Sequence, residues 1–216
     1  MADGISAAQF EEADGVEDWR VVAHGACAHF RTGVFATGLA LVNAVAELAE
    51  TANHHPDVDL RYAAVTVRLM SHDIGGLSRR DLALAQQISA AARALEVTAD
   101  PAAVQVVDLA IDAQASSEVM PFWRAVLGYD QVGEEDLVDP LGRWPAIWFQ
   151  EMDAPRPQRN RIHVDVWVPH DQAEPRVQAA IAAGGHLVSD EHAPAWWTLA
   201  DAEGNEVDVV TWRGRD

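Results

Sequence analysis

Three histidines in the first half of the chain have the residue type and spacing that proton transfer needs. His54 and His55 are adjacent, and His72 follows eighteen residues after His54. Imidazole has an unperturbed pKa of about 6.5, so one ring can act as the acid and another as the base near neutral pH. The three residues are therefore candidates for a general acid–base site.

Two other interpretations of these histidines stay open on spacing alone. A single histidine at a helix end is most often a cap, a surface group or a buried residue with a hydrogen-bond partner. Two adjacent histidines and a distant one can also ligate a metal, although no second pair at helical or strand spacing accompanies them in this half. The residues around the histidines carry more information than the spacing.

Helix and strand patterns indicate how the chain positions the histidines. Leu39 to Thr51 has apolar residues at helical spacing, and Pro56 disfavours helix at the preceding residue, so the adjacent pair should leave this helix on an extended turn. Tyr62 to Met70 is rich in β-branched residues and alternates in polarity, which predicts a half-buried strand. His72 should then share the face of Arg68.

Further elements complete a small domain around the histidines. Ser78 to Leu95 predicts a second helix, and Trp19 to Ala23 and Phe30 to Phe35 predict two strands before the first helix. The order of strand, strand, helix, strand, helix indicates an α+β fold with the helices on one face of an antiparallel sheet.

Two segments beside the histidines carry a family signature. Glu50 to Asp57 contains the adjacent pair, Tyr62 begins the strand that leads to His72, and Gly76 to Asp81 reads Gly-Leu-Ser-Arg-Arg-Asp. In this order and spacing, the chain closely resembles the pterin-4a-carbinolamine dehydratase family over residues 15 to 95. The resemblance implies an α+β domain that converts 4a-hydroxytetrahydropterin to quinonoid dihydropterin and water, with no cofactor required.

The resemblance also implies roles for the three histidines. His54, His55 and His72 match the active-site histidines of the family. We expect His54 and His72 to act in acid–base proton transfer and His55 to orient the pterin and take part in proton handling, as a third catalytic residue.

Three further residues are candidates for binding the substrate: Asp81, Glu50 and Trp19. Each also has a purely structural interpretation. Ser78 and Asp81 form a helix-start capping box, Glu50 suits a solvated helix end, and Trp19 suits a buried core.

The second half of the chain predicts a repeated pattern of strand, helix and strand. The first copy comprises Val104 to Ile111, Ser116 to Leu127 and Ala146 to Gln150. The second copy comprises Ile162 to Val168, Ala173 to Ala183 and a hairpin of Trp197 to Leu199 with Val207 to Trp212. Two β-α-β units of about 55 residues each are the simplest interpretation.

Three motifs in this half resemble the glyoxalase-like, vicinal oxygen chelate family over residues 104 to 213. They are Phe122 to Gly128, Arg159 to Asp165 and Asp201 to Asp208. The resemblance implies paired βαβββ modules whose sheets curl around one cavity. That cavity would bind a divalent metal or an unidentified small molecule.

The resemblance implies four candidate metal ligands in the second half: Asp108, Gln150, His163 and Asp208. Oxygen ligands with one imidazole suit a hard or borderline divalent ion. In the alternative interpretation, His163 bonds to a neighbouring residue, Asp208 pairs with an arginine, and the cavity holds a ligand without metal.

Charge and length restrict the classes of partner and the domain organisation. The 216 residues include 34 acidic residues against 15 arginines, for a net charge of −19, so neither nucleic acid nor an anionic membrane is an expected partner. A change of composition and Pro101 place a connector at Val97 to Ala103, between a dehydratase-like domain, residues 1–97, and a glyoxalase-like domain, residues 104–216.

The absence of a signal-peptide pattern and of any long apolar run predicts a cytoplasmic protein, and the lone Cys27 suggests no disulfide. Both resembled families self-associate, which predicts a homo-oligomer. The main functional hypothesis is a dehydratase with an appended small-molecule-binding domain. Two alternatives remain, a metal-dependent glyoxalase-like or dioxygenase-like enzyme in the second domain and a non-enzymatic ligand-binding or dimerisation protein.

Overall fold

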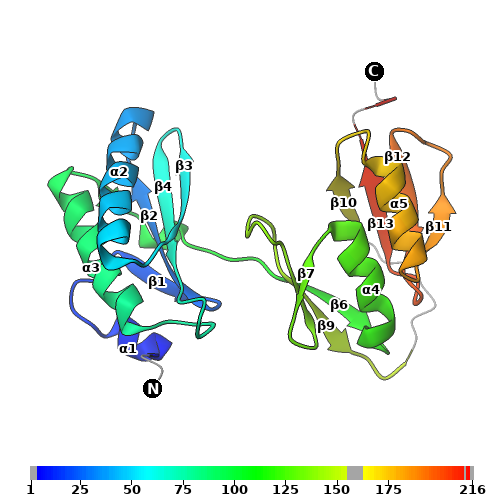
Figure 1. Cartoon of the computed structure of the whole chain (residues 1–216), viewed down its shortest axis with the longest axis horizontal. Helices are drawn as coiled ribbons and strands as arrows, with labels where there is room; N and C mark the ends of the chain where they lie inside the picture. The colour runs from blue at the N-terminus through cyan, green and yellow to red at the C-terminus, as the bar shows by residue number, and fades with distance from the viewer. Residues whose placement is uncertain (1–3, 155–162, 212, 215–216) are drawn as a thin grey trace. The chain divides into compact units, whose positions relative to one another are not determined.

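The chain folds as two compact units, Met1–Val106 and Val107–Asp216, each built around its own hydrophobic core (Figure 1). The computed structural model describes residues 4–154, 163–211 and 213–214. Residues Arg159 to Ile162 of the second glyoxalase-like motif and Trp212 of the expected hairpin lie outside the described residues. No helix within the described ranges combines the length and the apolar character that crossing a membrane requires.

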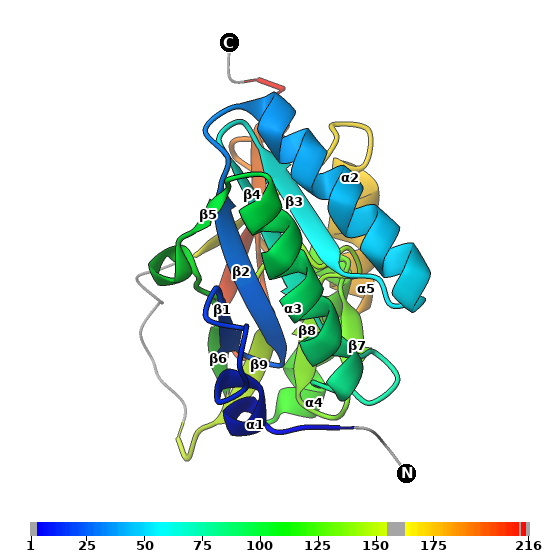
Figure 2. The ribbon, with the colours of Figure 1, turned by 90° about the vertical axis from the view of Figure 1, so that its left-hand side faces the viewer.

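The first unit is an antiparallel sheet covered by helices on one face (Figure 2). The strands run in the order β1-β2-β4-β3, and the short β5 pairs with β2. This arrangement confirms the predicted α+β class. The elements in chain order are α1 (Ala7–Glu11), β1 (Trp19–Val22), β2 (Gly25–Arg31), α2 (Phe35–Ala52), β3 (Asp57–Arg61), β4 (Ala64–Leu69), α3 (Arg79–Ala94), β5 (Thr98–Ala99) and a 3-10 turn (Pro101–Ala103).

Alternation in β4 explains how the sheet meets the helices. Val65, Val67 and Leu69 are fully buried in the core, whereas Thr66 and Arg68 between them are only partly buried. Because strand side chains alternate between the two faces, the apolar set turns toward α2 and α3. The expected strand from Tyr62 begins two residues later, since Tyr62 lies in the turn between β3 and β4.

Two local expectations for the first unit differ from the structure. β2 ends at Arg31 and Phe35 already begins α2, so the strand expected over Phe30 to Phe35 is correct only for Phe30 and Arg31. Gly33 with a φ of +71° and the bonds from the Thr32 and Gly33 amides to a carbonyl of the β3–β4 turn end the strand there. β3 was not expected, because its alternate positions are mostly exposed and charged.

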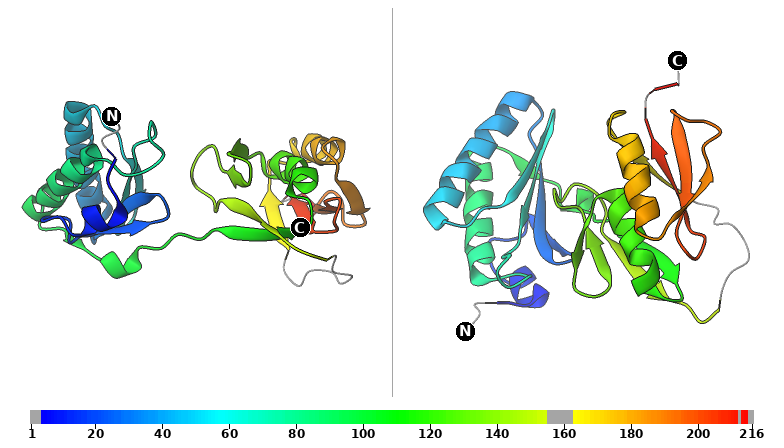
Figure 3. Two further views of the ribbon diagram at one scale, coloured as in Figure 1. Left: turned by 90° about the horizontal axis from the view of Figure 1, so that it is seen from below. Right: turned by 45° about the vertical axis from the view of Figure 1, so that its right-hand side comes forward.

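The second unit consists of two βαβββ modules, as the family resemblance implies (Figure 3). Each module forms one four-stranded sheet in which its first and fourth strands are parallel, and the orders are β6-β9-β8-β7 and β10-β13-β12-β11. The first module comprises β6 (Leu109–Ala113), α4 (Ser116–Leu127), β7 (Asp130–Val132), β8 (Asp136–Val138) and β9 (Ile147–Glu151). The second comprises β10 (Val164–Trp167), α5 (Ala173–Ala182), β11 (His186–Ser189), β12 (Trp196–Ala200) and β13 (Glu206–Val210).

Helices α4 and α5 pack against each other and share one core with both sheets. Their apolar faces bury Val119, Phe122 and Val126 from α4 and Val177 and Ala180 from α5. The shared core makes the two modules one folding unit rather than two.

Candidate functional site

His54 lies directly after α2 and is held inside the first unit. Asn53 ends the helix in the left-handed conformation, with a φ of +47°, and the His54 amide donates a hydrogen bond to the Ala49 carbonyl at 3.1 Å. This turn leaves His54 only 8% exposed and places its Nε2 atom 2.7 Å from Oδ1 of Asp81. The imidazole and the carboxylate form a buried pair whose members are far apart in sequence.

Asp81 is fully buried, and three groups bond to its second oxygen. Its Oδ2 atom accepts hydrogen bonds from the Ser71 hydroxyl at 2.7 Å and from the amide and hydroxyl of Ser78 at 2.7 and 2.8 Å. Burial opposes ionisation, but the bonds from His54, Ser71 and Ser78 outweigh it and lower the pKa of Asp81 below its ordinary value. The predicted capping box is present, and the same carboxylate also binds His54.

The ionised Asp81 determines which ring atom of His54 can exchange a proton. A carboxylate only accepts hydrogen bonds, so Nε2 of His54 must carry the proton that it donates to Oδ1. In the neutral ring, Nδ1 is then the basic atom. This is the arrangement by which a buried acid fixes the tautomer and orientation of a catalytic histidine.

His72 lies in a tight turn between β4 and α3, with its side chain exposed. β4 ends at Leu69 and Ser71 pairs with Gly76 across the turn, so the expectation that His72 continues the face of Arg68 does not hold.

The residue after His72 links this turn to α3. Asp73 accepts two hydrogen bonds from the guanidinium of Arg80 at 2.7 and 2.9 Å. Those bonds lower the pKa of Asp73, with a smaller favourable contribution from the nearby imidazole of His54. The turn that carries His72 is therefore tied to the first turn of α3, which also carries Asp81, the partner of His54.

The remaining candidates of the first unit divide into one exposed pair and one core residue. His55 and Glu50 are both exposed, and Nε2 of His55 lies 3.1 Å from Oε1 of Glu50. Trp19 is 1% exposed, donates its indole N–H to the Ser89 hydroxyl at 3.0 Å and packs edge-on against Phe30. The structure thus places Trp19 in the core, where it has no surface to offer a substrate.

A second cluster of potential ligands lies in the second unit, on the sheet of the second module. His163 stands immediately before β10, and its Nε2 lies 3.3 Å from Oδ1 of Asp165 and 3.7 Å from Oδ2 of Asp208. Among the described residues, these three could bring one ligand atom each to within 4.8 Å of the others. The Thr198 hydroxyl donates a 2.6 Å hydrogen bond to the other oxygen of Asp208 and orients it.

Two of the four predicted metal ligands, His163 and Asp208, lie in this cluster. The other two predicted ligands lie at the sheet of the first module. Asp108 directly precedes β6, and Gln150 is in β9, where its side-chain amide donates to the Glu151 carbonyl at 3.2 Å. The parallel strand pairs of the two modules can be compared residue by residue. The first paired residues are Leu109 and Ile147 in β6 and β9, and Val164 and Val207 in β10 and β13.

By this equivalence of the two modules, Trp148 rather than Gln150 occupies the position that Asp208 has in its own module. Asp108 correspondingly occupies the position of His163. The first module therefore presents an aromatic ring where the second presents a carboxylate.

Two residues that sequence reasoning missed complete these clusters. Asp165 stands two positions after His163, and a period of two along a strand puts both on one face. Ser71 precedes His72 directly, but nothing in the sequence shows that its hydroxyl turns back to Asp81. The spacing of Asp165 from His163 could therefore have predicted its place in the cluster, whereas the sequence carries no signal for the contact that Ser71 makes.

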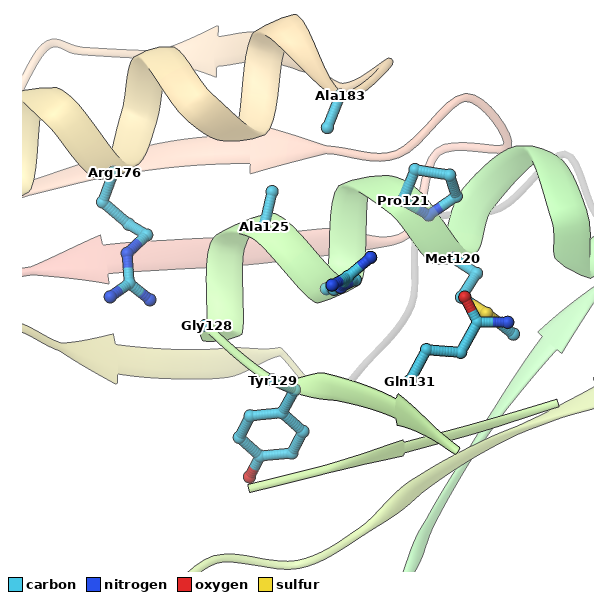
Figure 4. Close-up of a pocket in the computed structure, with 9 residues that line it drawn as sticks. Met120, Pro121, Ala125, Gly128, Tyr129, Gln131, Arg176 and Ala183 are labelled. Atoms are coloured by element: carbon cyan, nitrogen blue, oxygen red, sulfur yellow. The ribbon is translucent and has the colours of Figure 1, made fainter. Parts of the chain in front are cut away.

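A hollow of the second unit lies elsewhere, between α4 and α5 (Figure 4). It has a volume of about 620 Å³ and includes Tyr129, Gln131 and Arg176 in its wall. The guanidinium of Arg176 donates to the Val126 carbonyl at 3.0 Å, so it caps the end of α4. None of the predicted site residues contributes to this hollow.

Both halves of the chain match known protein families. An α+β domain with a buried histidine–carboxylate pair has the kind of site that acid–base enzymes use. Residues 3–91, which form most of this domain, match the family described as pterin 4 alpha carbinolamine dehydratase. A protein of Roseiflexus sp., assigned by name to these dehydratases, is 42% identical over 89 residues, which are 41% of this chain and 96% of that protein. The chain therefore belongs to the pterin-4a-carbinolamine dehydratase family.

Residues 108–210 match the glyoxalase-like domain, so both predicted resemblances are confirmed. A relative from Acidobacterium capsulatum, also assigned by name to the dehydratases, is 54% identical over 56 residues, 26% of this chain and 61% of its own length. Among solved structures, a transcriptional coactivator/pterin dehydratase from Brucella melitensis shares 25% identity at a TM-score of 0.39, over 41% of this chain and 97% of its own. A fosfomycin resistance protein from Listeria monocytogenes shares 10% identity at a TM-score of 0.42, over 52% of this chain and 98% of its own.

Proposed function

We propose that the first unit catalyses dehydration of 4a-hydroxytetrahydropterin to quinonoid dihydropterin and water. The observation that carries the proposal is the buried pair of His54 and Asp81, whose 2.7 Å bond fixes the proton on Nε2 and makes Nδ1 the basic atom. Family membership supplies the substrate class, and the pair supplies a group able to accept a proton.

The dehydration requires two proton transfers that balance. The bond between carbon 4a and its hydroxyl oxygen breaks as that oxygen receives a proton and leaves as water. The proton on the neighbouring ring nitrogen is taken up, and a double bond forms between that nitrogen and carbon 4a. We assign uptake of the nitrogen proton to Nδ1 of His54 and delivery of the other proton to His72, which is exposed and directly follows Ser71, a hydrogen-bond partner of Asp81.

His55 and Glu50 serve the pterin in a different way. Their side chains are 57% and 79% exposed, so neither is held in one position by the core. We assign them to binding and orienting the substrate at the open side of the site. Trp19 has no such role, because its indole is bonded to Ser89 within the core.

The proposal is tested by the dehydration rates of the wild type, His54→Ala and His72→Ala. We expect each variant to lose at least about a hundredfold in rate, the usual contribution of a general acid–base group. His186→Ala is the matched control, since it removes an exposed histidine from β11 of the other unit. Equal rates in all four proteins would contradict the mechanism, and a wild-type rate no higher than that of the uncatalysed reaction would favour a non-enzymatic protein.

A second candidate function belongs to the other unit, where we propose a site for a divalent metal at His163, Asp165 and Asp208. One imidazole and two carboxylates whose ligand atoms lie within 4.8 Å of one another are a donor set that such ions accept. Hydrogen bonding of Asp208 by Thr198 supports this assignment, because metal ligands are oriented by outer partners. A bound ion would act as a Lewis acid toward an oxygen of a small-molecule ligand.

The metal proposal is tested by elemental analysis of the purified protein after incubation with Mn²⁺ or Zn²⁺ and gel filtration. We expect about one equivalent of metal in the wild type, its loss in His163→Ala and its retention in His186→Ala. Equal metal content in the two variants would contradict the site. Absence of metal from the wild type would favour a metal-free ligand cavity in which His163 only pairs with the two aspartates.

A further inference from the structure

We infer that Ser71 is a positioning residue that couples the two proton-transferring histidines. The inference rests on the proposed dehydratase function of the first unit. Ser71 is 1% exposed, and its hydroxyl oxygen lies 2.7 Å from Oδ2 of Asp81 and 2.7 Å from the hydroxyl of Ser78. No substrate can reach the hydroxyl, so its effect on the reaction passes through its neighbours.

The hydroxyl of Ser71 orients the carboxylate that holds His54. Ser71 and Ser78 have two hydroxyl protons between them for three short oxygen–oxygen contacts, so these contacts form one shared network on Oδ2 of Asp81. A carboxylate whose Oδ2 is fixed in this way presents Oδ1 in one direction, toward Nε2 of His54. Loss of the Ser71 hydroxyl removes a donor from a buried charge and loosens that direction.

The backbone of Ser71 fixes the turn that carries His72. Its amide donates to the Gly76 carbonyl at 2.9 Å, and its carbonyl accepts from the amides of Ile74 at 3.2 Å and Gly76 at 3.4 Å. His72 is the next residue along the chain. One serine therefore anchors the turn of one histidine with its backbone and the carboxylate partner of the other with its side chain.

This double anchoring has a specific kinetic consequence. Displacement of catalytic groups by a fraction of an ångström slows the chemical step more than it weakens substrate binding. Replacement of the hydroxyl should therefore lower kcat and leave KM nearly unchanged. Threonine at this position, which also carries a hydroxyl, should restore the rate.

The test compares Ser71→Ala and Ser71→Thr with Ser89→Ala, which removes another buried serine hydroxyl of the same unit, one that bonds to Trp19. We expect kcat to fall about tenfold or more in Ser71→Ala with KM changed less than about twofold. Ser71→Thr should recover most of the lost rate, and Ser89→Ala should keep the wild-type kcat. An unchanged kcat in Ser71→Ala, or an equal loss in Ser89→Ala, would overturn the inference.

A spectroscopic measurement separates this inference from the proposed function. In ¹⁵N NMR spectra of imidazole-labelled protein, His54 should be the Nε2-protonated tautomer when neutral, and Ser71→Ala should reduce that preference and shift the His72 signals. Spectra of His54 and His72 that are identical in wild type and Ser71→Ala would overturn the coupling. If the wild type has no dehydratase activity, the proposed function fails, and these spectra still decide whether Ser71 links the two histidines.

Discussion

At the residue scale, the buried carboxylate of Asp81 serves the fold and the site together. Its Oδ2 satisfies the amide of Ser78 at the start of α3, and its Oδ1 holds His54. A carboxylate with several charge-assisted hydrogen bonds stays ionised despite burial, which explains why the pKa of Asp81 is lowered rather than raised. The two structural interpretations of this residue, helix cap and active-site acid, are therefore compatible.

The lowered pKa of Asp81 predicts an acid-sensitive stability. Since the folded-state pKa lies below the unfolded-state value of about 3.9, the carboxylate stabilises the fold above that pH, and the contribution is lost as pH falls through the folded-state pKa. The free energy of unfolding of the wild type, measured with urea, should fall steeply below about pH 4. Asp81→Asn should be less stable at pH 7 and show a shallower fall, and parallel curves would contradict this account.

At the element scale, the features that could be predicted are those with a strong local signal. α4 begins and ends as expected at Ser116 and Leu127, because its apolar spacing is regular and Gly128 ends it with a φ of +72°. α3 also begins where its local signal predicts, directly after Ser78, whose capping box with Asp81 is present. β3 and the two-residue β5 were missed, since partner strands rather than their own sequences keep them extended.

The same distinction applies to the candidate site. Histidines that a family signature marks can be found in a sequence, and so can an aspartate two positions after a histidine on a strand. The bond between His54 and Asp81 joins residues 27 apart, and the bond of Trp19 to Ser89 joins residues 70 apart. Such partners lie on different elements and depend on how α2, α3 and the sheet pack. The residue spacing within any one element does not predict that packing.

At the scale of the whole molecule, two units with separate cores share one strongly acidic chain. The residues of the two buried clusters do not overlap, and the division falls between Val106 and Val107. The whole of the expected connector, Val97 to Ala103, instead belongs to the first unit, where β5 pairs with β2 and a 3-10 turn follows. Self-association remains a prediction. The exposed apolar side chains of Phe35 and Leu39 in α2 are consistent with it.

Because the two units have separate cores, we expect them to unfold separately. Replacement of a buried acid in the second unit tests this expectation. Asp201 is fully buried and accepts hydrogen bonds from the Trp123 indole and from the amides of Glu203 and Asn205, all at 2.9 Å. Asp201→Ala leaves these donors unpaired and should cost the second unit about 2 kcal/mol or more.

The indole N–H signals of two buried tryptophans report on the two units separately. Trp19 is the only tryptophan in residues 1–106, and Trp123 bonds to Asp201 in the second unit. In a urea titration of Asp201→Ala followed by ¹H–¹⁵N NMR, the folded Trp123 signal should disappear at lower urea than in the wild type, whereas the Trp19 midpoint should not move. A common shift of both midpoints would mean that the two cores unfold together, because independent units cannot transmit a loss of stability from one to the other.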